Sequence, residues 1–500
     1  MLGPTRARSR VATFFALTWL LGGLWALATP LGGVPDEPGH VIRAASLLRG
    51  EVTGSPEVEW KGQRVDVARV PEPFASADPP CFAYPGAPTP ACDRGSHGRG
   101  DVLAEVENPF ATYNPSYYAL VGLPTLVHPE RGSVYGMRLL TAGLVAGLLA
   151  LALVALLELG APGWALVGLA VATTPMALFL SGSVNPSAIE IAAGIALWAT
   201  LLAWFTDPIP AHERSRAARA AVAAIALVST RAFAPFFLAV IVTGALVAAG
   251  TRPRTLLTRP AKHAALAVAI VTVVAVGWTL VAGTNSTTGN DYPEYENLRR
   301  FLYDVGLSLD DYERQMIGVF GWLDTPALEH VYVLWFGVLG LVCLAALVLG
   351  RPRHRAVVGG LVVLSVLAPI AFQWPVATDL GLIWQGRYLL PVMVGLPLVS
   401  GVALAAHAGW NTVMGSRLAL ALPLAILGVL QAASFWWALH RNVIGLDETW
   451  IGFTPLWQPP LGWIPLTLGF AAAISAWTAN LAALAGPPDA VRRSGSGRAS

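Results

Sequence analysis

Four side chains capable of chemistry follow the first strongly apolar segment, in the stretch VPDEPGHVIRAASLL. Asp36 is in a position to cap a short helix with a proline in its first turn. From that start, Asp36, His40 and Arg43 fall at helical spacing on one face. An acid, an imidazole and a cation on one surface could position a hydroxyl group and remove its proton, which is the work of a general base. The alternative is that Asp36 and Glu37 only cap and solvate a helix end.

Three arginines lie beside apolar segments further along the chain: Arg138 in the second apolar run, Arg231 in STRAFAP and Arg387 in WQGRYLLP. A guanidinium group next to hydrocarbon is costly unless an anion or a cavity receives it. Any one of them could extend to the interface instead. Three together predict an anionic ligand, and phosphate suits the planar fork of arginine. Glu190, one turn after SVNPS, either joins this site or pairs with a neighbouring helix.

Tyrosines are concentrated in YNPSYYAL, which contains Tyr113, Tyr117 and Tyr118. They could form a wall of a sugar-binding site or an ordinary belt of aromatic residues at the membrane interface. The surrounding stretch ENPFATYNPSYYALVGLPTLVHPE is apolar, short and bounded by prolines. It predicts a helix that lies in the interface or re-enters it, and a thirteenth transmembrane span is the alternative.

Transmembrane helices are the elements that must position these residues. Of the 500 residues, 55% are hydrophobic and 12% are charged, and the mean hydropathy is +0.58, outside the range of soluble domains. The net charge of +2 is not gathered into a basic patch, so no nucleic-acid partner is predicted. Motifs of zinc enzymes, P-loop ATPases and serine hydrolases are absent from the sequence.

A span requires about 20 mostly apolar residues, and the chain contains twelve candidate runs, of which the fifth is short. They cover residues 12–31, 133–157, 163–182, 187–205, 217–230, 232–249, 263–282, 330–349, 356–374, 387–407, 417–438 and 464–484.

Arginine positions predict the orientation, because short cytoplasmic loops carry an excess of basic residues. With the N-terminus in the cytoplasm, every basic cluster falls on the cytoplasmic side and most acids fall on the other. The clusters are 6–10, 214–219, 252–262, 351–355 and 492–498. We therefore expect a multi-pass protein of a bacterial plasma membrane, with both termini cytoplasmic and the candidate site extracytoplasmic.

The expected fold is an all-α polytopic bundle with a large first extracytoplasmic loop that carries juxtamembrane helices. The predicted segments are a cytoplasmic N-terminus at 1–11, the first transmembrane helix at 12–31, the first loop at 32–132, a transmembrane bundle at 133–282, a second extracytoplasmic loop at 283–329, a further bundle at 330–484 with an outer loop at 439–463, and a disordered cytoplasmic tail at 485–500.

Two of the three cysteines, Cys81 and Cys92, share the first loop. This pair suits a disulfide if the loop faces an oxidising compartment, and two free thiols are the alternative. Cys343 lies in an apolar run and is expected to be buried.

Four stretches together resemble a bacterial family of predicted membrane proteins of unknown function, which is similar to the GT-C superfamily of polytopic glycosyltransferases. The stretches are VPDEPGHVIRAASL, YNPSYYALVGLP, SGSVNPSAIEIA and WQGRYLLPVMVGLPL. The family pattern has a Pro-Asp-Glu-x-x-His motif in the first loop and a late Gln-Gly-Arg-Tyr motif. The resemblance runs in order from about residue 10 to about residue 440. NPSYY departs from the more usual double proline.

The resemblance implies a GT-C-like bundle of about 12 helices that transfers a sugar, with inversion, from a polyprenyl-phosphate donor to a hydroxyl group of an envelope glycan or glycoprotein. Asp36 would be the catalytic base, supported by Glu37 and His40, and Arg387 would hold the donor phosphate. Arg138 and Arg231 are expected to bind the same phosphate. The expected substrate-binding residues are Arg43, Tyr113, Tyr117, Tyr118, Glu190 and Gln385. No D-x-D motif follows Asp36, so a divalent metal ion is an open alternative without support from a motif, and no other cofactor is predicted.

The predicted position of the site, on the outer side of the membrane, also indicates a lipid-linked donor. Nucleotide sugars are confined to the cytoplasm, so a sugar donor on the outer side must be carried across on a lipid. A transporter or flippase of an anionic or lipid-linked solute is the main alternative, and it would place ionisable residues near the bilayer midplane. A non-catalytic scaffold in an envelope complex is the third interpretation.

Overall fold

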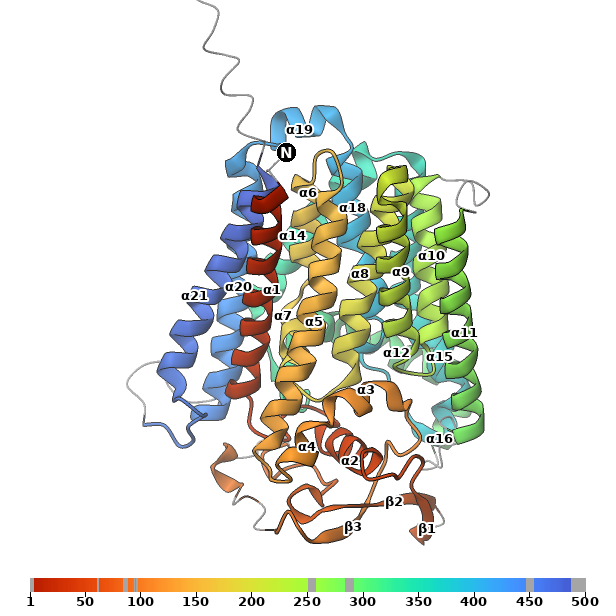
Figure 1. Cartoon of the computed structure of the whole chain (residues 1–500), viewed down its shortest axis with the longest axis vertical. Helices are drawn as coiled ribbons and strands as arrows, with labels where there is room; N and C mark the ends of the chain where they lie inside the picture. The colour runs from red at the N-terminus through yellow and green to blue at the C-terminus, as the bar shows by residue number, and fades with distance from the viewer. Residues whose placement is uncertain are drawn as a thin grey trace, which may run out of the picture.

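Long apolar helices form a bundle, with a layer of short helices and strands at one end (Figure 1). The computed structural model describes residues 4–60, 63–83, 89–93, 95, 98–250, 258–283, 292–446 and 454–486. Within these ranges, eight helices are long and apolar enough to cross a membrane. They are α1 (Pro4–Ala28), α5 (Ser133–Leu157), α8 (Pro186–Thr206), α11 (Arg259–Ala282), α14 (Glu329–Leu349), α15 (Pro352–Gln373), α20 (Arg417–Val443) and α21 (Trp463–Ala485).

Each of the twelve predicted spans overlaps a helix or a pair of helices, but a count of twelve spans is not confirmed. Two pairs qualify only as bent units, which gives up to ten spans among the described residues. The first pair is α6 (Gly163–Ala172) with α7 (Pro175–Ser181), bent by 63°. The second joins α17 (Leu390–Met393) and α18 (Gly395–Ala405) to α19 (Ala408–Met414), bent by 92°.

Local sequence explains the shorter helices. Pro175 follows two threonines and lacks the N–H group that would continue α6. The predicted fifth and sixth spans are α9 (Glu213–Val228) and α10 (Ala234–Ala249), of 16 residues each, which is short for a full crossing. Arg231 lies in the turn between them.

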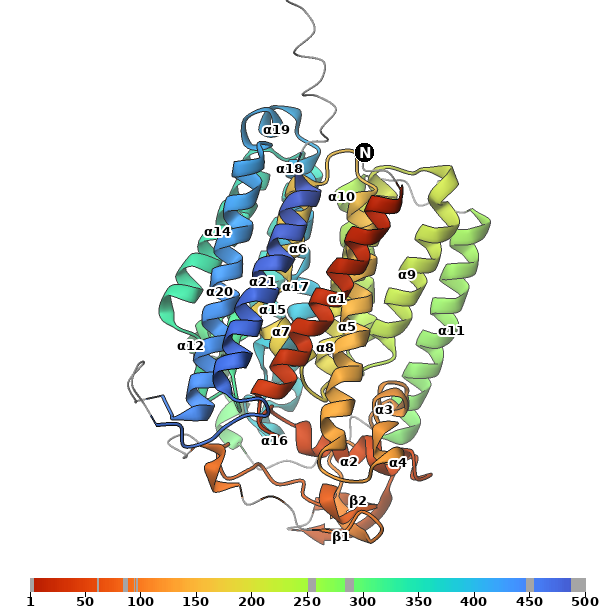
Figure 2. The same ribbon diagram turned by 60° about the vertical axis from the view of Figure 1, so that its left-hand side comes forward.

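Helix α8 is the centre of the core, since every residue from Pro186 to Phe205 is buried. It begins where the side chain of Asn185 caps the first turn by accepting a hydrogen bond from Ser187 N, with Pro186 in the first helical position. Helices α5, α9 and α10 pack around it. Helix α1 packs between α5 and α21 (Figure 2). The first apolar segment and the last are therefore neighbours in the bundle.

The first predicted loop, 32–132, forms the layer at the end of the bundle opposite the chain's N-terminus (Figure 1). Its helices are α2 (Glu37–Leu47), α3 (Pro115–Val121) and α4 (Pro124–Val127), and its strands are β1 (Ser55–Trp60), β2 (Gln63–Pro71) and β3 (Leu103–Glu107). The strands form an antiparallel sheet in the order β1-β2-β3.

The loop carries the predicted juxtamembrane helices and, in addition, this sheet, which the sequence analysis did not predict. The signal was present in VARV, where Ala68 and Val70 are buried and Arg69 between them is exposed and pairs with Glu105 across the strands. This alternation is the period of a half-buried strand. A search for runs of apolar residues does not detect it.

Helices α3 and α4 are 7 and 4 residues long, so neither spans a membrane and the alternative of a thirteenth span fails. Leu120, Leu123, Leu126 and Val127 are exposed on them. An exposed apolar face on short helices at the end of a bundle fits the predicted position at the membrane interface.

The second predicted loop contributes α12 (Leu298–Leu307), α13 (Leu309–Gly318) and a two-stranded hairpin of β4 (Val319–Phe320) and β5 (Thr325–Pro326). After α15, the chain passes through the short helix α16 (Ala377–Leu380) and the 3-10 turn η7 (Gly386–Tyr388). Turn η7 carries Arg387.

Helix α19 lies at the same end of the bundle as the N-terminus (Figure 1). Which leaflet each end faces remains a prediction from the distribution of arginines. Residues 487–500 of the predicted tail and 447–453 of the predicted outer loop lie outside the described residues.

Candidate functional site

Asp36 and Arg387 are in direct contact, although 351 residues separate them in sequence. Arg387 Nη2 donates a hydrogen bond to Asp36 Oδ2 at 2.6 Å. The guanidinium side chain is buried, whereas the carboxylate side chain is 33% exposed. The pair thus joins the beginning of α2 to turn η7, with the carboxylate on the accessible side.

The backbone at Asp36 is in the left-handed region, with φ of +69°. This conformation is unfavourable for most residues, although aspartate and asparagine tolerate it better than others. Asp36 occupies the N-cap position of α2, but its side chain does not cap the helix, so this expectation was wrong. The side chain turns to Arg387 instead. Strain of this kind is concentrated at functional sites in proteins.

Two glutamines hold the backbone that carries Arg387. Gly386 N donates to Gln315 Oε1 at 2.8 Å, and Trp384 N donates to Gln373 Oε1 at 2.9 Å. Gly386 has no room for a side chain, because a Cβ atom there would overlap the carbonyl group of Tyr312. Sequence analysis missed both glutamines. Gln373 is a polar residue at the end of an apolar helix, which was the available signal.

Arg231 is loosely held by Glu190 and Asn185. Its Nε lies 3.7 Å from Glu190 Oε2, too far for a hydrogen bond, and its Nη2 donates to Asn185 Oδ1 at 3.4 Å. Thr230 Oγ1 donates to Glu190 Oε1 at 3.0 Å. Glu190 is therefore an internal partner of the α9–α10 turn, one of the two roles considered for it.

Asn185 was missed by the sequence analysis, although it lies in one of the four quoted stretches. Besides contacting Arg231, it donates from Nδ2 to the Pro35 carbonyl group at 3.2 Å. It thus connects the start of α8 to the residue that precedes Asp36.

The ring of Tyr388 brings the two arginines together. The guanidinium carbon of Arg231 lies 5.3 Å from the ring centroid and that of Arg387 lies 5.5 Å from it. In the part of the chain that the structure describes, several buried N–H groups of this site have no hydrogen-bond acceptor. They are Arg387 Nε and Nη1 and Arg231 Nε, and the buried Oε1 of Gln385 also lacks a partner. Buried donors without acceptors are costly, so their number here calls for a ligand.

His40 is fully buried beside this group. Its Nδ1 shares a hydrogen bond of 2.9 Å with the Tyr118 hydroxyl, its ring stacks on Phe110 with centroids 4.2 Å apart, and its Nε2 has no partner among the described residues. Burial, followed by the charges of Arg231 and Arg387, lowers the pKa of His40 well below its usual value. His40 is therefore a neutral ring at physiological pH.

This lowered pKa predicts acid sensitivity. Below about pH 6.5 the unfolded chain binds a proton at His40 and the folded chain does not. The free energy of unfolding therefore decreases as the pH is lowered, by at most about 1.4 kcal/mol per pH unit. We expect wild-type protein to lose more stability between pH 6.5 and pH 5 than His40→Asn, because the carboxylates and other histidines contribute equally to both. Thermal unfolding in detergent across this range measures the difference. Parallel curves for the two proteins would contradict the prediction.

Glu37 and Arg138 form a separate, completely buried pair. Arg138 Nε donates to Glu37 Oε1 at 2.8 Å and Nη2 donates to Glu37 Oε2 at 2.5 Å. The remaining N–H groups of Arg138 are used by carbonyl groups of Ala26, Thr29 and Pro30 at 2.7–2.8 Å. With these contacts, neither residue offers a free polar atom to a ligand. We therefore do not retain Arg138 in the phosphate-binding group or Glu37 beside the base.

Glu37 also accepts hydrogen bonds from two backbone amides, Gly32 N at 3.0 Å and Val184 N at 2.9 Å. Through Glu37 and Arg138, the end of α1, the start of α2, α5 and the α7–α8 connection are tied at one point. The pair supports the backbone on which Asp36 sits.

Arg43 and two of the tyrosines also make internal contacts. Arg43 Nη2 donates to the Tyr113 carbonyl group at 2.8 Å, and the Tyr117 hydroxyl pairs with Thr141 Oγ1 at 2.9 Å. Tyr113 is half-buried, whereas Tyr117 and Tyr118 are buried, and the Tyr113 ring lies with its centroid 6.1 Å from that of His40. Of the predicted wall of tyrosines, Tyr113 is the one that can face a substrate.

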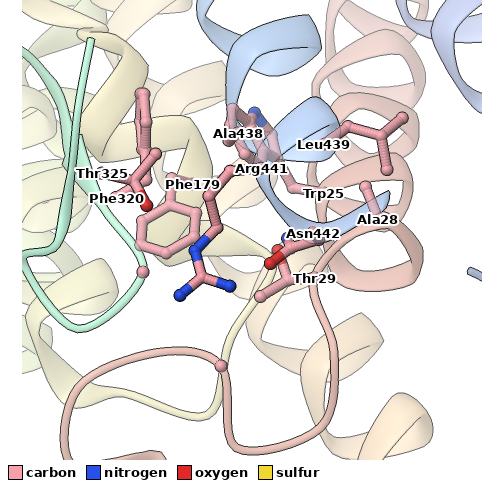
Figure 3. Close-up of a pocket in the computed structure, with 12 residues that line it drawn as sticks. Trp25, Ala28, Thr29, Phe179, Phe320, Thr325, Ala438, Leu439, Arg441 and Asn442 are labelled. Carbon is pink, nitrogen blue, oxygen red and sulfur yellow. The ribbon is translucent and has the colours of Figure 1, made fainter. Parts of the chain in front are cut away.

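A second buried ion pair lies at a cavity of about 10 Å³, room for a single water molecule. Figure 3 shows Arg441 and Asn442 of α20 near Thr29 and Phe179. Arg441 Nη2 donates to Asp324 Oδ2 at 2.6 Å and to the Phe82 carbonyl group at 2.7 Å. This pair fastens the end of α20 to the β4–β5 hairpin and to the first loop, and the cavity is too small for a substrate.

Cys81 and Cys92 form a disulfide in the first loop, and Cys343 is free. In the described part of the chain, no group of three or more histidine, cysteine, aspartate or glutamate residues is arranged to hold a metal ion.

Comparison with known proteins gives a family and a distant structural likeness. Two crystal structures of ArnT from Cupriavidus metallidurans are similar to this chain, one bound to undecaprenyl phosphate and one in the apo state. Each of the two matches has 13% sequence identity and covers 76% of the ArnT chain. The bound form covers 95% of this chain with a TM-score of 0.42, and the apo form covers 96% with a TM-score of 0.43. No curated protein matches the sequence.

The family model described as "Predicted membrane protein (DUF2142)" matches residues 19–396, which is most of the chain and includes Asp36, Arg231 and Arg387. This match confirms the resemblance to a family of predicted membrane proteins. The protein is a multi-pass membrane protein and belongs to the DUF2142 family.

Proposed function

We propose that the protein is an integral-membrane glycosyltransferase that transfers a sugar from a polyprenyl-phosphate donor to a hydroxyl group of a cell-envelope acceptor, on the extracytoplasmic side. The observation that carries the proposal is the contact between the Asp36 carboxylate and an Arg387 guanidinium whose buried Nε and Nη1 have no acceptor among the residues that the structure describes. A candidate base thus lies beside buried cationic donors.

Phosphate is the anion that this site fits best. Nε and Nη1 of Arg387 lie on different edges of its guanidinium group and have no acceptor among the described residues, and a phosphate oxygen can accept from either of them. Arg231 lies against the same tyrosine ring and is held only by long contacts, so it can turn toward a second phosphate oxygen. A phosphate on a lipid presents its charge at headgroup depth, and the site lies at the end of the bundle where α2 and η7 meet.

The reaction follows from these positions. Asp36 accepts the proton of the acceptor hydroxyl as that oxygen forms a bond to the anomeric carbon. The bond between that carbon and the donor phosphate oxygen breaks at the same time, and its electron pair remains on the phosphate. Attack from the side opposite the leaving group inverts the anomeric centre. Arg387 and Arg231 stabilise the charge that develops on the phosphate.

His40 has a supporting role in this proposal. A neutral imidazole fixed by Tyr118 and Phe110 adds no charge next to the two arginines, and its unpartnered Nε2 is available to a substrate oxygen. Tyr113 supplies an aromatic face on the same side.

Proteoliposomes containing the protein, radiolabelled polyprenyl-phosphate sugars and an envelope extract as acceptor test the proposal. We expect label to move from the lipid fraction to the extract, and not in liposomes without protein. Movement of the labelled lipid across the bilayer without transfer would support a transporter instead. Neither transfer nor movement with any donor would support a scaffold.

Arg387→Lys separates charge from geometry at the phosphate site. Lysine keeps the cation but loses the fork, and each lost charge-assisted hydrogen bond costs about 1.5–3 kcal/mol. We therefore expect undecaprenyl phosphate to bind about 10- to 100-fold more weakly, as measured by titration in nanodiscs. Arg300→Lys changes an exposed arginine in an i,i+4 surface pair and is the matched control, with no effect expected. Unchanged binding by Arg387→Lys would remove Arg387 from the phosphate site.

A further inference from the structure

A cleft of about 480 Å³ is lined in part by α2, and His40 of the same helix is not among its lining residues. Its volume is in the range of ligand-binding pockets. Its lining includes Glu37, Pro38 and Val41 of α2, residues between Pro73 and Cys81, and Arg131 and Val134, which lie on either side of the start of α5. None of the residues proposed for transfer lines it, so nothing described above accounts for it.

The cleft is apolar inside and has polar side chains at its edge. Leu31, Val41 and Phe74 contribute apolar surface, while Ser76 and Asp78 are exposed. Asp93 and Arg131 form an ion pair of 2.9 Å in which each side chain remains about 30% exposed. Carboxylates and a hydroxyl group around an apolar floor match a ligand that has many hydroxyl groups and apolar C–H faces, as sugars do.

The lining argues against a peptide as the occupant. Four of its residues, Pro38, Pro73, Pro79 and Pro80, have no backbone N–H group. An extended peptide gains affinity mainly by pairing its main chain with backbone donors and acceptors. A wall rich in proline lacks these donors. Hydroxyl groups, in contrast, donate directly to side-chain carboxylates.

The walls are braced from several directions. The Cys81–Cys92 disulfide belongs to the lining, and the Asp93–Arg131 pair ties the same segment to α5. Glu37 is anchored by Arg138 and by two backbone amides. A cleft whose walls are held in place loses little conformational entropy on binding. This small loss helps to offset the entropy that a flexible, polar ligand such as a glycan loses.

We infer that this cleft binds the glycan chain of the acceptor, at a distance from the hydroxyl group that reacts. The inference rests on the proposed function. Asp36 directly precedes Glu37 and Pro38, which line the cleft, so the cleft and the proposed base share the start of α2. The cleft thus selects the acceptor, Asp36 takes the proton from the acceptor hydroxyl, and Arg387 binds the donor phosphate.

Blocking the cleft chemically tests the inference. Ser76→Cys places a thiol at the exposed edge, and a bulky methanethiosulfonate reagent then fills the cleft. Thr53→Cys is the matched control, because Thr53 is exposed in the same loop and does not line the cleft. We expect labelled Ser76→Cys protein to lose transfer to the envelope extract but to retain binding of undecaprenyl phosphate, whereas labelled Thr53→Cys protein retains both.

The outcomes separate this inference from the proposed function. Full transfer by labelled Ser76→Cys protein, beside an active wild type, would overturn the acceptor cleft and leave the transferase standing. If wild-type protein transfers no sugar, saturation-transfer NMR with oligosaccharides released from the envelope decides the matter. Oligosaccharide signals that disappear when labelled Ser76→Cys protein is used would show that the cleft binds a glycan in a protein that is not a transferase. Signals from envelope peptides instead of oligosaccharides would overturn the inference.

Discussion

Asp36→Asn is expected to lower the rate of sugar transfer by about 10²–10⁴-fold, the range that general-base catalysis contributes. The amide has no basic oxygen to take the acceptor proton, so the loss should fall on the rate at saturating donor. Binding of undecaprenyl phosphate should change little, because the donors of Arg387 that await the phosphate do not contact Asp36. Initial rates in proteoliposomes and lipid titrations measure the two effects separately.

Asparagine is the appropriate replacement because of the backbone. Asp36 has a φ of +69°, a conformation that asparagine adopts more readily than alanine. The amide oxygen can also accept from Arg387 as the carboxylate does. Asp101→Asn is the control, since Asp101 pairs with Arg99 on an exposed surface, and it should leave the rate unchanged. Equal transfer by wild type and Asp36→Asn would remove Asp36 as the base.

The helices were predictable because membrane spans depend on a local property, the length of an apolar run. The predicted run 133–157 coincides with α5. The bend after Ala172 was harder to predict from the sequence, because Pro175 is compatible with one kinked span as well as with two helices. The exact count of spans depends on such bends, which average hydropathy does not report.

The contact between Asp36 and Arg387 could not be derived from spacing, because it joins the beginning of one helix to a turn more than three hundred residues later. Residue type and apolar surroundings did identify both members as candidates. What the sequence did not distinguish was an arginine that keeps N–H groups without an acceptor among the described residues from an arginine whose N–H groups are all used by the protein. Arg387 and Arg138 look alike in sequence, and only their hydrogen bonds separate them.

Supporting residues were the least predictable part of the site. Gln315, Gln373 and Asn185 are common polar residues, and they act through hydrogen bonds to distant backbone or side-chain groups. No motif or periodicity marks such contacts. They follow from tertiary packing, which a single sequence specifies only implicitly.

Arg138→Met is expected to lower the free energy of unfolding by about 3–5 kcal/mol, because it leaves the Glu37 carboxylate buried without its cation. The carbonyl groups of Ala26, Thr29 and Pro30 lose their donors in the same variant. Unfolding by SDS in mixed micelles measures the change. Arg99→Met, which breaks an exposed pair, is the control and should leave the stability unchanged.

A second variant distinguishes a structural pair from a binding residue. Arg138→Met combined with Glu37→Gln removes the unpaired charge, and the amide oxygen can still accept from Gly32 N or Val184 N. The double variant should therefore be more stable than Arg138→Met alone, since the uncompensated charge is the larger part of the cost. If Arg138→Met instead keeps full stability and loses undecaprenyl phosphate binding, Arg138 reaches the donor, and the phosphate site extends from η7 to α5.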